Sequence, residues 1–206
     1  MSLISHSFFR LSMFCLLILP VAAQTPSGQP ASPDPALGLR AALVLTPEFC
    51  ATTIKQGDKM WTGVEKFEVG TSACAELEPA LQGVFRQLHR VAAPPEAGTG
   101  EVVLVPRLVS ASATRPTGIT IFNKPKKDLL VVVEWTVKDS AGKTAWFQTV
   151  QGTATAKGRA NGTISKKDMK ILVDAAVEDA AKQSAAKMLS APELRKLAED
   201  AVPPKP

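Results

Sequence analysis

The chain has 206 residues, a formal net charge of +5 and a hydrophobic fraction of 45%, values that suit one folded domain with one apolar core. It contains no tyrosine and only two histidines, so side chains for acid–base catalysis are few. A charge this small, spread among acidic neighbours, falls short of the clustered positive field of a nucleic-acid-binding protein. We therefore expect no nucleic-acid partner.

Residues 1–23 have the layout of a cleaved secretory signal. Arg10 precedes an apolar run over residues 11–19, and the small residues Val21-Ala22-Ala23 follow. The run is shorter than the roughly 20 residues that a membrane-spanning helix needs. We therefore predict an exported protein, periplasmic or secreted, cleaved near Ala23, and the alternative is an uncleaved N-terminal anchor. Without residues 1–23 the formal charge is +4.

Composition divides the rest of the chain. Residues 24–38 are rich in Pro, Ser and Gly and have no apolar period, which is typical of a disordered linker. Residues 39–200 are predicted to form a single α+β domain, and residues 201–206 a disordered, Pro-rich tail.

The first half of the domain is predicted to contain strands and one helix. An apolar run at 39–49, broken by Pro47, indicates a buried strand, residues 52–63 a polar loop, and residues 64–70 a weak strand. A helix is expected from near Glu76, because Pro79 is tolerated only in its first turns. Its apolar stripe comprises Leu77, Leu81, Val84, Phe85 and Leu88.

His89 follows that stripe, and we expect it near the helix C-terminus, where a histidine favours the negative end of the helix dipole. It is the only histidine after residue 23, and no motif supplies it with a catalytic partner. We therefore expect that the protein is not an enzyme.

The second half begins with a strand at 101–114, in which Pro106 indicates an edge position or a bulge. A hairpin follows at 129–154, with Asp139, Ser140 and Gly142 as turn residues. If Asp139 opposes Lys143, two different faces result. One face pairs Trp135 with Phe147 and Val133 with Thr149, and the other pairs Thr136 with Trp146 and Val132 with Val150.

A long amphipathic helix at 165–189 is the strongest local pattern, opened by a capping box of Ser165 and Asp168. Ser190 with Glu193 is predicted to cap a last short helix at 191–200. The buried stripe of the long helix is predicted to be Met169, Leu172, Val173, Ala176, Val177 and Ala180.

These elements predict a two-layer α+β sandwich: a three- to five-stranded, mostly antiparallel sheet with two amphipathic helices on one face. The other hairpin face then has no helix to cover it. An uncovered apolar face is typical of a protein interface, which we predict to contain Leu130, Val132, Trp146 and Val150. The alternative is that the loop from Cys50 to Gly63, including Trp61, covers this face.

Cys50 and Cys74 are predicted to form a disulfide, because an even pair in an exported protein favours one. Two free buried thiols are the alternative. A metal site is disfavoured, since no nearby His or further Cys completes a ligand set. We expect no metal and no cofactor.

A second candidate site is the segment 115–127, in which apolar side chains lie among cations. This pattern suits an anionic membrane surface, and the alternative is an ordinary edge strand with solvated lysines. The candidate lipid contacts are Ile119, Ile121, Phe122, Lys124, Lys126 and Lys127.

Several short motifs carry a family resemblance over roughly Arg40 to Leu189. They are Val69-Gly70 before the helical Leu77, Leu81 and Phe85, then Val105-Pro106, and finally Asp139, Gly142, Lys143 and Trp146 at the hairpin. In these motifs the chain resembles small envelope accessory proteins of Gram-negative bacteria. The nearest types are the lipopolysaccharide-assembly lipoprotein that plugs an outer-membrane translocon, and the auxiliary lipoproteins of envelope ABC transporters.

The resemblance implies a strand-helix-three-strand-helix fold and an adapter role without catalysis. The chain departs from these families because it lacks their lipidation cysteine. Cys15 lies inside the apolar run and not directly after it. We therefore expect an exported envelope accessory protein that binds a protein partner through an exposed sheet face. The alternative is a periplasmic binding protein that holds a small apolar or glycan ligand between the Trp61 loop and the sheet.

Overall fold

The computed structural model describes residues 37–57, 64–114, 126–157 and 165–201. All of them belong to one unit, residues 33–206. The predicted signal, most of the predicted linker and nearly all of the predicted tail lie outside the described residues.

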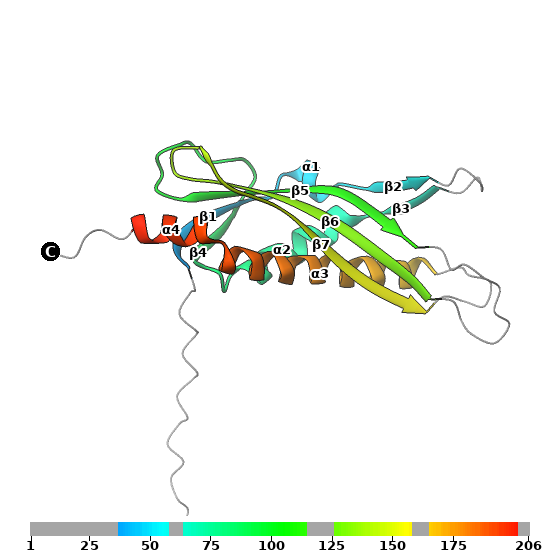
Figure 1. Ribbon diagram of the computed structural model, residues 1–206. Coiled ribbons are helices and arrows are strands. Elements are labelled where there is room, and N and C mark those ends of the chain that lie inside the picture. The colour runs from blue at the N-terminus through cyan, green and yellow to red at the C-terminus, as the bar shows by residue number, and fades with distance from the viewer. Residues whose placement is uncertain (1–36, 58–63, 115–125, 158–164, 202–206) are drawn as a thin grey trace, which may run out of the picture. The chain divides into compact units, whose positions relative to one another are not determined.

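The described part is an α+β fold with one large sheet (Figure 1). Five strands follow the order β4-β1-β5-β6-β7, and two short strands, β2 and β3, pair separately. The strands are β1 (Leu37–Val44), β2 (Ile54–Gly57), β3 (Val64–Phe67), β4 (Phe85–Val91), β5 (Val102–Ala113), β6 (Lys126–Lys138) and β7 (Thr144–Lys157). The helices are α1 (Pro47–Cys50), α2 (Val69–Leu81), α3 (Lys166–Ser190) and α4 (Pro192–Asp200).

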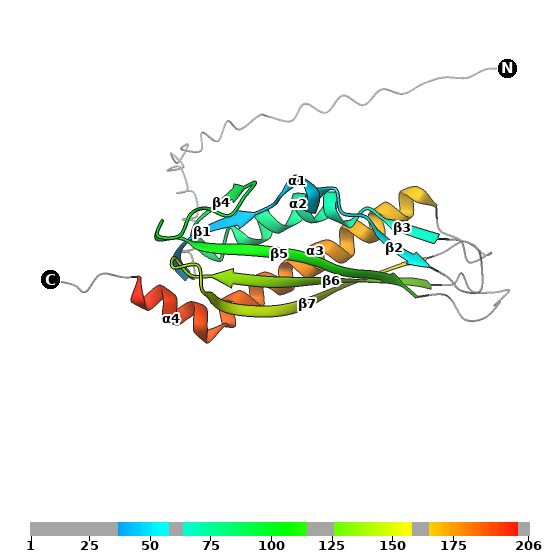
Figure 2. The ribbon, with the colours of Figure 1, turned by 90° about the horizontal axis from the view of Figure 1, so that it is seen from above.

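The sheet is mixed, so the prediction of a mostly antiparallel sheet was wrong for one half. Strand β1 runs parallel to both of its neighbours, β4 and β5. The chain passes from β1 to β4 through α2, and a crossover through a helix joins parallel strands. The other half, β5-β6-β7, is antiparallel as predicted (Figure 2).

The predicted first helix was wrong at both ends. Helix α2 begins at Val69 and continues through Pro79, and it ends at Leu81. Phe85 starts β4, where it pairs with Leu37 of β1. Gly83 separates the two elements and favours the break, because glycine is a poor helix former. The predicted stripe therefore combines Leu77 and Leu81 of a helix with Phe85 and Leu88 of a strand, whose spacing matches a helical period only by coincidence.

The predicted polar loop at 52–63 contains a strand that sequence reasoning missed. Strand β2 pairs antiparallel with β3, whose weak pattern was predicted correctly. Gln56 of β2 makes two hydrogen bonds with Ala113 of β5. Its Nε2 donates to the Ala113 carbonyl at 3.2 Å, and the Ala113 backbone amide donates to its Oε1 at 2.7 Å. A polar side chain thus anchors the small hairpin beside the large sheet.

Pro106 lies where β5 loses its neighbour on one side, which agrees with the prediction of a local edge. Pairing between β1 and β5 runs only from Ala41–Val102 to Leu43–Leu104. The register of β5 against β6 then shifts between Leu108 and Ser110. A residue without an N–H is accepted at such a place.

The capping predictions had opposite outcomes. The Ser165 hydroxyl accepts from the Asp168 amide at 3.1 Å and donates to the Asp168 carboxylate at 2.6 Å, so the start of α3 is confirmed. Ser190 instead donates to the Lys187 carbonyl at 3.0 Å. Helix α4 begins at Pro192 after the extended Ala191, without a side-chain cap.

Helix α3 packs along β6 and β7, on the face that also meets α2 (Figure 1). Gly152 allows the closest approach, because a Cβ there would lie 2.1 Å from the Ala176 carbonyl oxygen and 2.3 Å from the Ala180 amide nitrogen. Nearby, the buried Trp135 donates through Nε1 to Ser184 Oγ at 2.8 Å, and Ser184 donates to the Ala180 carbonyl at 2.7 Å. The predicted stripe of α3 is buried here except for the half-buried Met169.

Gly152→Ala should lower the free energy of unfolding by about 2 kcal/mol, because the added methyl group forces α3 away from β7. Gly38→Ala is the matched control, since a Cβ at Gly38 meets nothing within 4 Å. The control should raise stability by up to about 1 kcal/mol, because alanine loses less backbone entropy on folding. Urea denaturation of both variants measures the difference, and equal midpoints would contradict this packing.

Candidate functional site

The face of β5, β6 and β7 that points away from α2 and α3 is open in the described part of the chain (Figures 1 and 2). We call it the open face. Trp135, Val137 and Val133 of β6 are buried on the helix side, so the alternate residues point to the open face. Cross-strand pairing arranges it in rows, namely Val105–Thr136–Phe147, Arg107–Glu134–Thr149 and Ser112–Leu130–Thr153.

The first row supplies an exposed aromatic side chain. Phe147 is 55% exposed, whereas Val105 and Thr136 beside it are half-buried. Strands fix the backbone of all three residues, so the ring stands on a rigid base. Sequence reasoning missed Phe147, because the expected register paired it with Trp135 on the face that the helices cover.

The second row carries an ion pair. Arg107 Nε donates to Glu134 Oε1 at 2.7 Å. This hydrogen bond is the main reason that the pKa of Glu134 is lowered and the pKa of Arg107 is raised. The ion pair therefore stabilises the fold at pH values above the unfolded-state pKa of Glu134. This stabilisation is lost as the pH falls through the lowered folded-state pKa of Glu134.

Two of the four residues predicted for the interface are on the helix side. Trp146 pairs with Val137 and Val150 pairs with Val133, and their exposed fractions are 8% and 0%. Leu130 and Val132 do lie on the open face, but Leu130 is half-buried and Val132 is buried. Exposure of Trp146 and Val150 was therefore wrongly predicted.

A bulge explains the error. The turn closes almost as expected, since the Asp139 amide donates to the Lys143 carbonyl at 2.8 Å and Lys138 pairs with Thr144. The next pair is Val137 with Trp146, so Ala145 is an extra residue in β7. A shift of one residue moves every following side chain to the other face.

The predicted lipid segment is mostly outside the described residues. This holds for Ile119, Ile121, Phe122 and Lys124, and for Trp61 of the predicted ligand cleft. Lys126 and Lys127 open β6, where Lys126 is exposed and Lys127 is buried.

His89 lies in β4, so its expected place at a helix end was wrong. Its Nε2 is 3.6 Å from Glu101 Oε2, while Arg40 donates to Glu101 Oε1 at 2.8 Å. The Arg40 ion pair already occupies the buried Glu101 carboxylate, which suits a structural contact. Within the described ranges, no group of three or more His, Cys, Asp or Glu residues could hold a metal ion.

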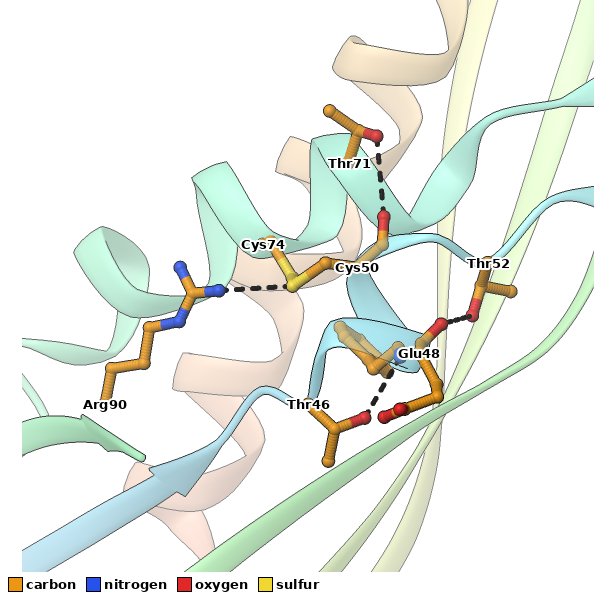
Figure 3. The surroundings of a disulfide bond; sticks show 8 residues. Thr46, Glu48, Cys50, Thr52, Thr71, Cys74 and Arg90 are labelled. Carbon is orange, nitrogen blue, oxygen red and sulfur yellow. Dashed lines mark hydrogen bonds between the residues drawn. A yellow bond between two sulfur atoms is a disulfide. The ribbon is translucent and has the colours of Figure 1, made fainter. Parts of the chain in front are cut away.

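The disulfide between Cys50 and Cys74 is confirmed, with sulfur atoms 2.00 Å apart (Figure 3). It ties α1 to α2, and a chain-entropy estimate gives about 3 kcal/mol of stabilisation for a loop of this length. Gly70 makes the contact possible, since a Cβ there would lie 2.3 Å from the Phe49 carbonyl oxygen. Arg90 also donates to Cys50 Sγ at 3.2 Å.

A groove of about 440 Å³ lies between β3, α2 and the start of α3. Phe67 and Val173 line it and are buried, and Met169 lines it and is half-buried. At one side Ser72 donates to Asp174 at 2.6 Å and Lys170 donates to Asp174 at 2.8 Å. Burial raises the pKa of Asp174, but these two hydrogen bonds and the positive charge of Lys170 together outweigh it and leave the pKa below its usual value.

No family model and no curated protein sequence matches the chain. Among solved structures, a homolog of a neuraminyllactose-binding hemagglutinin from Helicobacter pylori is similar with a TM-score of 0.51 and 10% identity, covering 81% of this chain and 91% of that one. A minor lipoprotein from Acinetobacter baumannii is similar with a TM-score of 0.41 and 14% identity, covering 76% and 94%. Rare lipoprotein B from Shewanella oneidensis is similar with a TM-score of 0.34 and 15% identity, covering 73% of this chain and 91% of that one.

At these identities the likeness to the Helicobacter protein shows the fold alone, and the two lower TM-scores carry no argument. The specific family stays a prediction. In the part of the chain that the structure describes, no helix is long and apolar enough to cross a membrane.

The neighbours Trp146 and Phe147 test the register directly. Trp146→Ser should lower the free energy of unfolding by about 3 kcal/mol, because it removes a buried aromatic side chain. Phe147→Ser should change it by less than about 0.5 kcal/mol, because that side chain is exposed. Chemical denaturation distinguishes the two, and a larger loss for Phe147→Ser would restore the register expected from the sequence.

Proposed function

We propose that this chain is an exported envelope accessory protein that binds a protein partner through the open face and catalyses no reaction itself. The observation that carries the proposal is Phe147, 55% exposed on a rigid sheet whose helices lie on the other face. Exposed aromatic side chains are frequent anchors of protein interfaces.

The surroundings of Phe147 support this role. The next row offers the Arg107–Glu134 ion pair and the exposed Thr149. A polar rim around an apolar anchor is the usual composition of an interface that forms and dissociates. The rows that follow carry hydroxyl groups, which can bond to a partner without exposing further apolar surface to water.

The disulfide and the N-terminal pattern support export. Disulfides persist in oxidising compartments such as the bacterial periplasm, and the Cys50–Cys74 bond closes within the folded unit. The layout of residues 1–23 is the pattern of a secretory signal. The absence of catalysis is proposed because Glu101, the carboxylate beside His89, already binds Arg40.

Site-specific photo-crosslinking tests the open face. A photoreactive residue in place of Phe147 or Thr149 should give the same discrete adduct in intact cells, because both positions face a bound partner. The control position is Ile171 on α3, which is 56% exposed and lies away from the open face. An adduct at Ile171 of equal yield, or none at either sheet position, would contradict the proposal.

A second candidate function is binding of a small ligand in the groove beside α3. Its volume of about 440 Å³ falls within the usual range of ligand pockets. Phe67, Met169 and Val173 form the apolar lining. Lys66 and Lys166 beside them outnumber the one acidic lining residue, Glu68, which favours an apolar ligand with an anionic group.

Laurate should raise the melting temperature of the protein if this groove is a ligand site, because a ligand that binds only the folded state stabilises it. Met169→Glu should abolish the shift by placing a carboxylate in the lining. Ile171→Glu, two residues away on the exposed side of α3, should retain it. Equal shifts in both variants, measured by thermal denaturation, would exclude the groove.

A further inference from the structure

Two pairs of lysines lie directly opposite each other on neighbouring strands. Lys55 of β2 pairs with Lys66 of β3, and Lys126 of β6 pairs with Lys157 of β7. All four side chains are exposed. Like charges in directly opposed positions destabilise a sheet, so both pairs oppose folding locally.

Both pairs lie at the same end of the domain. Gln56, next to Lys55, bonds to Ala113 at the end of β5, and Ala113 pairs with Leu129 near the start of β6. The ends of β2, β5 and β7 and the beginnings of β3, β6 and α3 gather there in both views (Figures 1 and 2).

Helix α3 adds two more cations to this end. Lys166 and Lys167 occupy its first turn, where the positive end of the helix dipole disfavours a cation. Lys166 and Lys66 line the same groove, which places the helix start beside the β2–β3 pair. We call Lys55, Lys66, Lys126, Lys157, Lys166 and Lys167 the lysine end.

The lysine end is not neutralised by ion pairs in the described part of the chain. None of its six lysines forms one there, whereas Lys170 and Lys182 on α3 do. Three carboxylates lie nearby: Asp128 and Asp168, which accept hydroxyl bonds of 2.6 Å from Thr155 and Ser165, and Glu68, which lines the groove with Lys66 and Lys166. Six lysines outnumber these three carboxylates, so an excess of positive charge faces the solvent.

We propose that the lysine end docks on the surface of an anionic lipid bilayer. Its cations come from β2, β3, β6, β7 and α3 and are spread over one end of the domain, which matches an extended negative surface better than a single anion. Anionic headgroups offset the repulsion within the opposed pairs and at the start of α3. The inference does not rest on Phe147, although Lys126 and Lys157 form the last row of the open face, at the far end of β7 from Phe147. Lys126 is also among the lipid contacts predicted from the sequence.

Flotation with lipid vesicles tests the proposal. Residues 24–206 are used, because they contain the whole folded unit and lack the apolar run that would itself enter lipid. The protein should float with phosphatidylcholine vesicles containing roughly one third phosphatidylglycerol and should not float with phosphatidylcholine alone, and added salt should release it.

The triple variant Lys55→Gln, Lys126→Gln and Lys157→Gln should bind the anionic vesicles about a hundredfold more weakly at low salt, because each cation near the surface contributes several-fold. Its melting temperature should rise by about 1 to 3 °C, since it relieves like-charge repulsion. A higher melting temperature together with lost binding separates a docking role from a folding defect.

The matched control removes the same charge elsewhere, through Lys143→Gln, Lys187→Gln and Lys196→Gln. These exposed lysines lie at the hairpin turn, at the end of α3 and in α4, away from the lysine end. The control should float like the unchanged protein. Equal loss in both triple variants would reduce the effect to net charge and overturn the proposal, as would failure of the unchanged protein to float. Retention on soluble polyphosphate without flotation would overturn it in favour of a soluble polyanion.

Discussion

The close contact between β7 and α3 at Gly152 determines how the rest of the domain is arranged. The Ala176 carbonyl and the Ala180 backbone occupy the space that a side chain on β7 would fill. A helix pressed this closely onto a sheet needs small residues at the point of contact, and α3 carries Ala176, Ala180 and Ala181 in this part of its buried stripe. The Trp135 indole then fills the space beyond the alanines, and Ser184 satisfies its N–H. A large residue at Gly152 would separate the two layers.

This contact also decides which face of the sheet is available for binding. With α3 fixed against Gly152, the register of β6 and β7 places Val133, Trp135 and Val137 under the helix. The alternate residues are then left for the opposite side, and Phe147 is exposed there because it lies one position past Trp146. The bulge at Ala145 is therefore a functional feature in the proposed role, since it exchanges the faces of two neighbouring aromatic residues.

Local patterns in the sequence predicted the elements whose signals are contained in a few residues. The capping box at Ser165, the apolar stripe of α3 and the hairpin at Gly142 each depend on neighbours within one or two turns of chain. The Cys50–Cys74 bond was predictable from the expected export of the chain and the even number of cysteines that remain after residue 23. The apolar stripe near Phe85 misled because a strand and a helix can share an apolar residue, and only the partner strand β1 decides between them.

The site was harder to predict, because it depends on one residue of register. The alternation of β7 is the same with or without a bulge, so no period in the sequence reveals that Ala145 is extra. The turn at Asp139 and Lys143 was placed almost correctly, yet all positions beyond the bulge were assigned to the wrong face. The lysine pairs show the same limit, since Lys55 and Lys66 become neighbours only when a segment without an apolar period forms β2.

The two proposed surfaces have a geometric relation that constrains any partner. Phe147 and Lys157 lie on the same strand, ten residues apart, which corresponds to about 30 Å at the usual rise of a strand. If the lysine end rests on a bilayer with the strands upright, the Phe147 row stands well clear of the headgroups. A partner that binds both the same membrane and this row must therefore extend about that far from the lipid surface. A small protein lying flat on the bilayer could not reach Phe147, whereas the soluble part of a membrane-embedded assembly could.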